Sequence, residues 1–537
     1  MEDSYFKNII NDKVLNCIPR ILSLLDKNPY SRTYGSFDRK YWHYKILDFS
    51  CGMQQELVLP LAYVWKVNFP GNRYHGIPRI KDYIEGVFLY HEKCSHKDGS
   101  LDDYFPHERA FGATAYALAA LTEAMLITGI QVNVAIKSFE KSGSFLASYK
   151  EAGRLSNHLA IASLALTNLY LLTGKSIWKE GSEKIIDKLE EKQDSEGWFP
   201  EYEGCDLGYQ TVTVEFLARQ YRKAPSKKLM NMVSRNLTFL NNFFHPDGSF
   251  GGEFGSRNTY NFYPGGFAVL SSEFPEAANI LFYFFKGFKE GSCNYLEDDG
   301  VFGHILSSYV TTMMYPYIRI SEPILSECVD KPAIKYYENS GLFVGRTNGL
   351  AIFGSLTKGG CCKIFKHDRL IWSDTGFIGE LNDGTKFCQN NPRISTGLVN
   401  KNRIELSGYF KKYLSKRLDR IQMIAFRIFS IFFGWSKNYS NLIRYVIQRS
   451  IIYNVKPLNI EFKRDIIINE QEIRIEDEII NKEKRKIVSL HRSTDCVNMH
   501  VITSDSFQIV HLLSWEKMSI EPNSNRYRYD KNFEANE

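Results

Sequence analysis

Two apolar stretches dominate the first half of the chain: ATAYALAALTEAMLITG at residues 113–129 and HLAIASLALTNLYLLTG at residues 158–174. Both are apolar on most sides of a helical period, and such helices are buried by other helices. Both end in Thr-Gly, which is typical of a helix C-terminus. Further segments with helical periodicity lie at residues 6–25, 176–193, 208–222, 228–244, 274–288 and 307–320. We therefore predict two layers of helices, as in a toroid or a solenoid.

Three long connections between these helices share a pattern. They are HKDGSLDDYFPHERAFG at 96–112, DSEGWFPEYEGCDLGYQ at 194–210 and HPDGSFGGEFGSRNTYNFYPGG at 245–266. Each has an Asp-Gly or Glu-Gly turn near its start, where Gly accepts a positive φ. The aromatic and acidic residues that follow make each connection longer than a plain helix link requires. We predict that the three loops gather at one end of the ring and line a carbohydrate-binding cleft.

The pattern changes near residue 335 to short β-rich runs with Gly and Asn-Gly turns. After residue 456 apolar and polar residues alternate, which is typical of antiparallel strands with one buried face. The sequence therefore predicts an α+β multidomain protein, with an incomplete (α/α) toroid at 1–335 and an antiparallel β-sandwich at 336–537. Strands are expected at 458–469, 473–480, 486–492, 498–503 and 507–521.

A basic segment, predicted as a helical insertion at about 405–452, interrupts the sandwich. Residues 401–450 hold eleven Lys or Arg and two acidic residues, a net +9, so the remainder of a chain at +6 carries −3. The apolar run 421–435 is too short to span a bilayer. Its basic flanks fit an amphipathic helix on anionic lipid, with contact through 409–450. A helix packed on the rest of the protein explains the pattern equally well.

Composition excludes several classes of protein. A net charge of +6 over 537 residues does not indicate nucleic-acid binding. The polar, acidic N-terminus lacks the features of a signal peptide. The ten cysteines include no CxxC pair, which favours free thiols in a reducing compartment. We expect a cytoplasmic protein, peripheral on the inner face of the cytoplasmic membrane if the basic segment binds lipid. Motifs for nucleotides, zinc proteases and serine hydrolases are absent.

Four groups of residues have chemistry suited to a site. Asn157 and His158 lie near the start of an apolar helix, where buried polar groups need partners, whether structural or substrate. Tyr209 lies at a helix N-terminus, whose positive end favours the phenolate. Arg257 presents a planar fork that suits a carboxylate, or equally a clamp within its own loop. His304 is a natural acid or base near neutral pH.

This combination resembles the heparinase II/III-like polysaccharide lyases, in which an incomplete α/α toroid precedes an antiparallel β-sandwich. The resemblance implies that Asn157 or His158 neutralises a uronate carboxylate. It implies that Tyr209 removes the C5 proton and protonates the leaving oxygen, with His304 as a second base or a substrate ligand. Arg257 would bind a neighbouring carboxylate. The other expected substrate-binding residues are Tyr202, Asn258, Glu253, Trp198, Glu108 and Arg109.

One departure concerns the stretch SLTKGGCCKIFKHDRLIWSDTGFIGEL at 355–381, which keeps SDTG but lacks the His pair common in the family. We therefore expect no bound metal and no cofactor. The expected partner is an acidic polysaccharide or a lipid-linked glycan.

Four functions remain open from the sequence. The first is a lyase that cleaves a uronic-acid polysaccharide by β-elimination, and the second is a C5-epimerase or related enzyme of capsule or exopolysaccharide synthesis. The third is a glycosidase, which needs two carboxyl groups. The fourth is a non-catalytic glycan-binding protein. Carboxyl groups available to a glycosidase are Asp102, Asp103, Glu108, Glu201, Glu203, Asp206 and Glu253.

Overall fold

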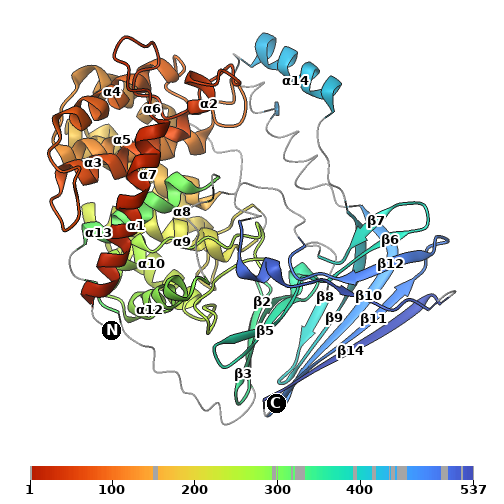
Figure 1. Ribbon diagram of the computed structural model, residues 1–537. Coiled ribbons are helices and arrows are strands. Elements are labelled where there is room, and N and C mark those ends of the chain that lie inside the picture. Colours follow the sequence, from red (N-terminus) through yellow and green to blue (C-terminus); the bar gives the residue numbers. More distant parts are fainter. Residues whose placement is uncertain are drawn as a thin grey trace.

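The computed structural model places a body of helices beside a β-sheet domain (Figure 1). The predicted order, an α/α toroid followed by an antiparallel β-sandwich, is confirmed. Helices extend to Met314, and strands begin at Ala333. The residues that the structure describes are 3–148, 155–202, 204–292, 298, 300–315, 318–320, 333–390, 396–413, 419–434, 436, 442–443, 456–496, 506–521 and 524–535.

An inner ring of helices forms the centre of the toroid. Each inner helix packs on the next one, and the last packs on both the fifth and the first. The members are α3 (Val58–Lys66), α5 (Phe111–Thr128), α7 (Ser156–Thr173), α9 (Leu207–Lys223), α11 (Gly265–Leu270) and α13 (Phe302–Met314). The glycines that end α5 and α7 are left-handed, as the Thr-Gly signals predict. Among the described helices, only α5 has the length and hydropathy of a membrane span, and it is buried between α3 and α7.

An outer layer surrounds this ring. Its helices are α1 (Asp3–Leu24), α4 (Pro78–Cys94), α6 (Asn133–Ser148), α8 (Ser176–Lys192), α10 (Lys227–Leu240) and α12 (Pro275–Glu290). The helices predicted from the sequence do not include α3, α4, α6 or α11. In α4 and α6 the buried residues form one face of an otherwise polar helix, which gives a weaker signal than the fully apolar inner helices. Two short elements, α2 (Arg39–Trp42) and η1 (Gly52–Leu57), precede α3.

The three long loops begin with the same turn. In each, the glycine amide donates to the carbonyl three residues earlier, and φ lies between 77° and 103°. A Cβ on any of these glycines would lie 2.2–2.4 Å from the backbone of an outer helix. The turns therefore need glycine both for backbone conformation and for close approach. The pairs in contact are Gly99 with Lys141 of α6, Gly197 with Arg235 of α10, and Gly248 with Gly287 of α12.

The β domain has two antiparallel sheets. The small sheet has the order β1-β2-β3-β4-β5, and the large one has the order β13-β12-β6-β7-β9-β10-β11-β14, with β8 paired to β9. The strands are β1 (Ala333–Tyr337), β2 (Leu342–Arg346), β3 (Leu350–Ser355), β4 (Cys361–Lys366), β5 (Arg369–Asp374), β6 (Phe377–Leu381), β7 (Lys386–Cys388), β8 (Thr396–Val399), β9 (Arg403–Lys412), β10 (Pro457–Ile468), β11 (Glu472–Asn481), β12 (Ile487–Arg492), β13 (Glu516–Lys517) and β14 (Arg526–Glu534).

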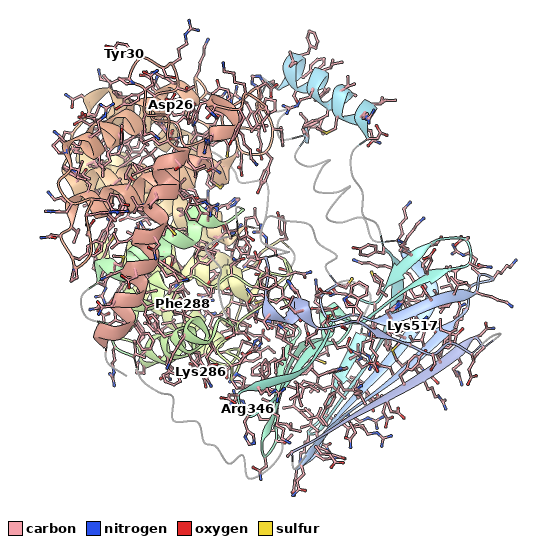
Figure 2. All side chains as sticks on the ribbon, in the orientation of Figure 1. Asp26, Tyr30, Lys286, Phe288, Arg346 and Lys517 are labelled. Atoms are coloured by element: carbon pink, nitrogen blue, oxygen red, sulfur yellow. The ribbon has the colours of Figure 1, made fainter. Side chains whose placement is uncertain are left out.

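The small sheet lies between the toroid and the large sheet. Phe353 and Phe365 belong to the core of the toroid, and their rings lie 4.9 Å from the ring of His245. Ile352 and Ile364 belong instead to the core shared with the large sheet. Both faces of β3 and β4 are thus covered. Lys286 of α12 extends this boundary with an ion pair to Asp368 at 3.5 Å (Figure 2).

Two predictions in the C-terminal part are corrected. Residues 403–412, predicted to begin the insertion, form β9, because Ile404, Leu406 and Phe410 alternate into the core. The helix of the insertion is α14 (Arg420–Phe433). Within 507–521, predicted as a strand, only η4 (Ile509–Leu512) and the short β13 are regular. The strand predicted at 498–503 lies outside the described residues.

The SDTG turn belongs to a buried ion-pair network inside the sandwich. Arg464, fully buried on β10, donates to Asp374 of this turn at 2.7 Å and to Asp477 at 2.6 Å. Arg492 also donates to Asp477, at 3.0 Å. A buried charge needs an ion pair and hydrogen bonds. Asp374 of the SDTG turn supplies them to Arg464, so the turn has a structural role.

Candidate functional site

The three long loops converge at one end of the inner ring, as predicted. The amide of Ser256 donates to the carbonyl of Cys205 at 2.9 Å, which joins the third loop to the second. Leu155, just before α7, forms a β-bridge with Glu201 of the second loop. The first loop reaches the start of α7, because a Cβ on Gly112 would lie 2.6 Å from the ring of His158.

Glu201 is the centre of the first group of side chains. It is fully buried and accepts hydrogen bonds from the Asn157 side-chain amide at 2.8 and 2.9 Å and from the Asn157 backbone at 2.9 Å. Tyr116 of α5 donates to Asn157 Oδ1 at 3.3 Å. Arg257 completes the group with an ion pair to Glu201 at 3.1 Å. Burial raises the pKa of Glu201, and Arg257 opposes that shift.

Tyr209 and Arg257 form the second group. The guanidinium carbon of Arg257 lies 3.6 Å from the centroid of the Tyr209 ring and 4.7 Å from that of Tyr202. Asp206 caps α9 and accepts from the amides of Tyr209 at 3.1 Å and Arg257 at 2.8 Å, which fixes both residues. Although burial lowers it, the pKa of Arg257 is raised by Tyr209, Tyr202 and Glu201. A permanent cation this close attracts the electron-rich face of the Tyr209 ring.

His304 and Glu56 form the third group. Nδ1 of His304, on α13, lies 2.6 Å from Oε2 of Glu56, on η1. The His304 ring also packs on Tyr116, with centroids 4.3 Å apart. Burial lowers the pKa of His304, but the charge and hydrogen bond of Glu56 outweigh it and raise the pKa above its usual value. His304 is therefore suited to carry a proton at neutral pH.

The first loop contributes the carboxyl group of Asp103. Burial raises its pKa to about 6, and Cys51 donates to it at 3.2 Å. Charges of His304, Glu56 and His158 act on it as well. Glu108 supports this part of the loop by accepting from the amides of Asp103 and Tyr104, at 3.2 and 2.7 Å.

Two buried tyrosines connect the groups. Burial raises the pKa of both Tyr116 and Tyr263. Tyr116 joins the first and third groups, because it donates to Asn157 and its ring packs on that of His304. Tyr263 lines one pocket together with Glu56, Tyr116 and His304. We call the assembled residues the rim cluster: Glu56, Asp103, Tyr116, Asn157, Glu201, Tyr209, Tyr263, Arg257 and His304. His158 borders it, with its ring 6.4 Å from that of Tyr116.

Known structures with similar architecture were found, although no protein-family model and no curated protein matches the sequence. A chondroitin AC lyase mutant from Streptomyces coelicolor A3 has a TM-score of 0.50 at 9% identity, covering 91% of this chain and 68% of the other. The chain shares its fold with this lyase. Heparinase III gives 0.49 at 11% identity, covering 90% and 75%. A cellobiose 2-epimerase from Bacillus thermoamylovorans B4167 gives 0.43 at 14% identity, covering 58% and 99%.

Several predicted substrate-binding residues contact other parts of the protein. Their role in binding substrate stays a prediction. Glu253 accepts from Tyr260 and from Ser373 of β5, Asn258 accepts from Lys358 at 2.7 Å, Trp198 donates to Glu196 at 3.0 Å, and Arg109 pairs with Asp98 at 2.9 Å. The Ser373 and Lys358 contacts join the third loop to the β domain.

Sequence reasoning missed three members of the rim cluster. Glu56 lies in GMQQELVLP, which has no recognisable motif, and Tyr116 and Tyr263 looked like ordinary buried aromatics. One signal was available for Glu56, because a charged residue next to the apolar run of α3 needs a partner. Its partner, His304, lies 248 residues away along the chain.

Proposed function

We propose that this chain is a carbohydrate-active enzyme that abstracts the C5 proton of a uronic-acid residue in a polysaccharide, as a β-eliminating lyase. The observation that carries the proposal is the stacking of Arg257 on Tyr209, in a cluster where Glu201, Asn157 and Tyr116 link Arg257 to His304. A proton next to a carboxylate is weakly acidic, because the enolate gains a second negative charge. Removing it requires a cation for the carboxylate and a base for the proton.

The rim cluster supplies both groups. The imidazolium of His304, maintained by Glu56, neutralises the carboxylate. The phenolate of Tyr209, favoured by Arg257, takes the C5 proton. The electron pair of the C5–H bond forms the C4–C5 double bond, the bond from C4 to O4 breaks, and the Tyr209 phenol returns its proton to O4. Asn157 and Glu201 position Arg257, and Asn157 serves the carboxylate only if it exchanges its bond to Glu201.

The hydrogen bonds of the carboxyl groups that a glycosidase could use favour elimination over hydrolysis. Five of them accept hydrogen bonds from the protein at 2.9 Å or less: Asp102, Glu108, Glu201, Asp206 and Glu253. Asp103, whose described hydrogen bond comes from a thiol, is the remaining described candidate. A paired-carboxylate hydrolysis needs two accessible groups. Glu203 lies outside the described residues.

The test is incubation of the protein with a panel of uronate polymers in deuterated water, followed by absorbance and mass. A lyase gives unsaturated products that absorb in the ultraviolet. Deuterium at C5 without chain cleavage identifies an epimerase, and new reducing ends without unsaturation identify a glycosidase. Either of those results replaces the elimination mechanism, and binding without any conversion indicates a glycan-binding protein.

A further inference from the structure

The helix of the basic segment is α14, and its described contacts with the toroid lie on one face. The rings of Phe426 and Phe105 lie 5.2 Å apart, and Arg427 pairs with Asp48 at 3.2 Å. Ser430 is buried, and Gly434 approaches His107 so closely that a Cβ would lie 2.7 Å from it. In Figure 1, α14 lies beside the toroid and away from the sheets of the β domain. The helix therefore has a fixed orientation on the toroid.

The opposite face of α14 is apolar and exposed. Ile421 is 79% exposed, Ile424 60%, Ile431 61% and Phe432 64%. Residues three, four and seven apart share one side of a helix, so these side chains form a continuous apolar stripe with Ile428. Asp419 and Gln422 form a capping box that fixes the start of the helix. Among the described residues, no other helix leaves so many large apolar side chains in water.

The charge of the segment that contains α14 indicates what covers this stripe. Residues 413–450 hold seven Lys or Arg and one acidic residue. A helix binds the surface of an anionic bilayer when it has an apolar face and lies in a basic segment. Helix α14 has both properties. The net positive charge of this segment also disfavours a second copy of this chain at the stripe, because two such segments would repel one another.

We propose that α14 docks this protein on anionic phospholipid, with Ile421, Ile424, Ile428, Ile431 and Phe432 inserted below the headgroups. The inference is independent of the proposed lyase chemistry. It has one geometric consequence for the rim cluster, however. Phe105 and His107, which hold α14, belong to the same loop as Asp103, so docking sets this loop close to the lipid surface.

The experiment is flotation of the full chain with vesicles of phosphatidylglycerol and phosphatidylcholine, compared with vesicles of phosphatidylcholine alone. We expect binding to the anionic vesicles at low salt and weaker binding at high salt, because salt screens the charges. Ile424→Asp with Ile428→Asp should reduce partitioning at least about tenfold, since two apolar side chains leave the lipid. Failure to float with anionic vesicles at low salt overturns the proposal.

The matched control is Val134→Asp with Ile177→Asp, which changes residues 53% and 58% exposed on the outer helices α6 and α8. This control should float like the unchanged protein, and an equal loss in both double variants overturns the assignment to α14. Sedimentation of the protein without lipid tests the alternative that a second copy of this chain covers the stripe. A dimer that the α14 variant converts to a monomer shows that the stripe is a protein interface and overturns lipid docking.

Discussion

The imidazole of His304 and the carboxyl group of Glu56 lie 2.6 Å apart, across the junction of α13 and η1. Because Glu56 raises the pKa of His304, Glu56→Gln should lower that pKa. In the proposed mechanism His304 acts as the imidazolium, so activity is lost as pH rises through this pKa. The alkaline limb of kcat/KM should therefore move to lower pH.

An NMR titration of His304 checks the same shift without substrate. Glu85→Gln, which changes a surface carboxylate paired with Lys81, should leave both the limb and the titration in place. An unmoved limb in Glu56→Gln would show that His304 does not act as a charged group.

Tyr209→Phe should abolish turnover, because the phenol oxygen is the proposed proton acceptor and donor. The ring that stacks on Arg257 remains, so the free energy of unfolding should change little. Tyr221→Phe, near the other end of α9, is the matched control and should keep full activity. The measurements are product absorbance and urea denaturation. Full activity in Tyr209→Phe would exclude Tyr209 as the base.

Breaking the buried pair of Glu201 and Arg257 should destabilise the protein. Arg257→Gln leaves Glu201 buried with Asn157 alone and should cost about 3 kcal/mol. The double variant Glu201→Gln/Arg257→Gln should cost less than the sum of the two single changes, with a coupling of about 1–3 kcal/mol.

Urea denaturation of all four proteins measures this coupling. The exposed pair Lys228 and Asp187 serves as the control and should show a coupling below about 1 kcal/mol. Equal couplings for the two pairs would contradict the structural role of Glu201.

Gly197→Ala should destabilise the toroid more than Gly174→Ala. Both glycines have positive φ, which costs an alanine about 1–2 kcal/mol. A Cβ at Gly197 also overlaps the carbonyl oxygen of Arg235 at 2.4 Å, whereas nothing lies within 4 Å of a Cβ at Gly174. The total cost at Gly197 should reach about 3 kcal/mol, as in an overpacked core. Equal midpoints in urea for the two variants would refute the close-approach argument.

The sequence allowed much of the candidate site to be predicted, because its loops carry a repeated signal. The Asp-Gly or Glu-Gly turns and the residues after them placed Tyr209 and Arg257 in one cleft, and Asn157 followed from its position near the start of a buried helix. The partners of these residues were not predictable. Glu201 looked like one of many acids, and only the structure shows that it connects Asn157 to Arg257.

The sequence by itself determined the two architectures and their order. Helical periodicity, Thr-Gly ends and strand alternation are local properties, fixed by residues within a few positions of one another. Only the tertiary structure decided how the small sheet is sandwiched between the toroid and the large sheet, and which residues meet in the rim cluster. Glu56 and His304 are 248 positions apart, and they meet because α13 packs beside η1 and α3. That contact results from packing of the whole ring, and no local pattern encodes it.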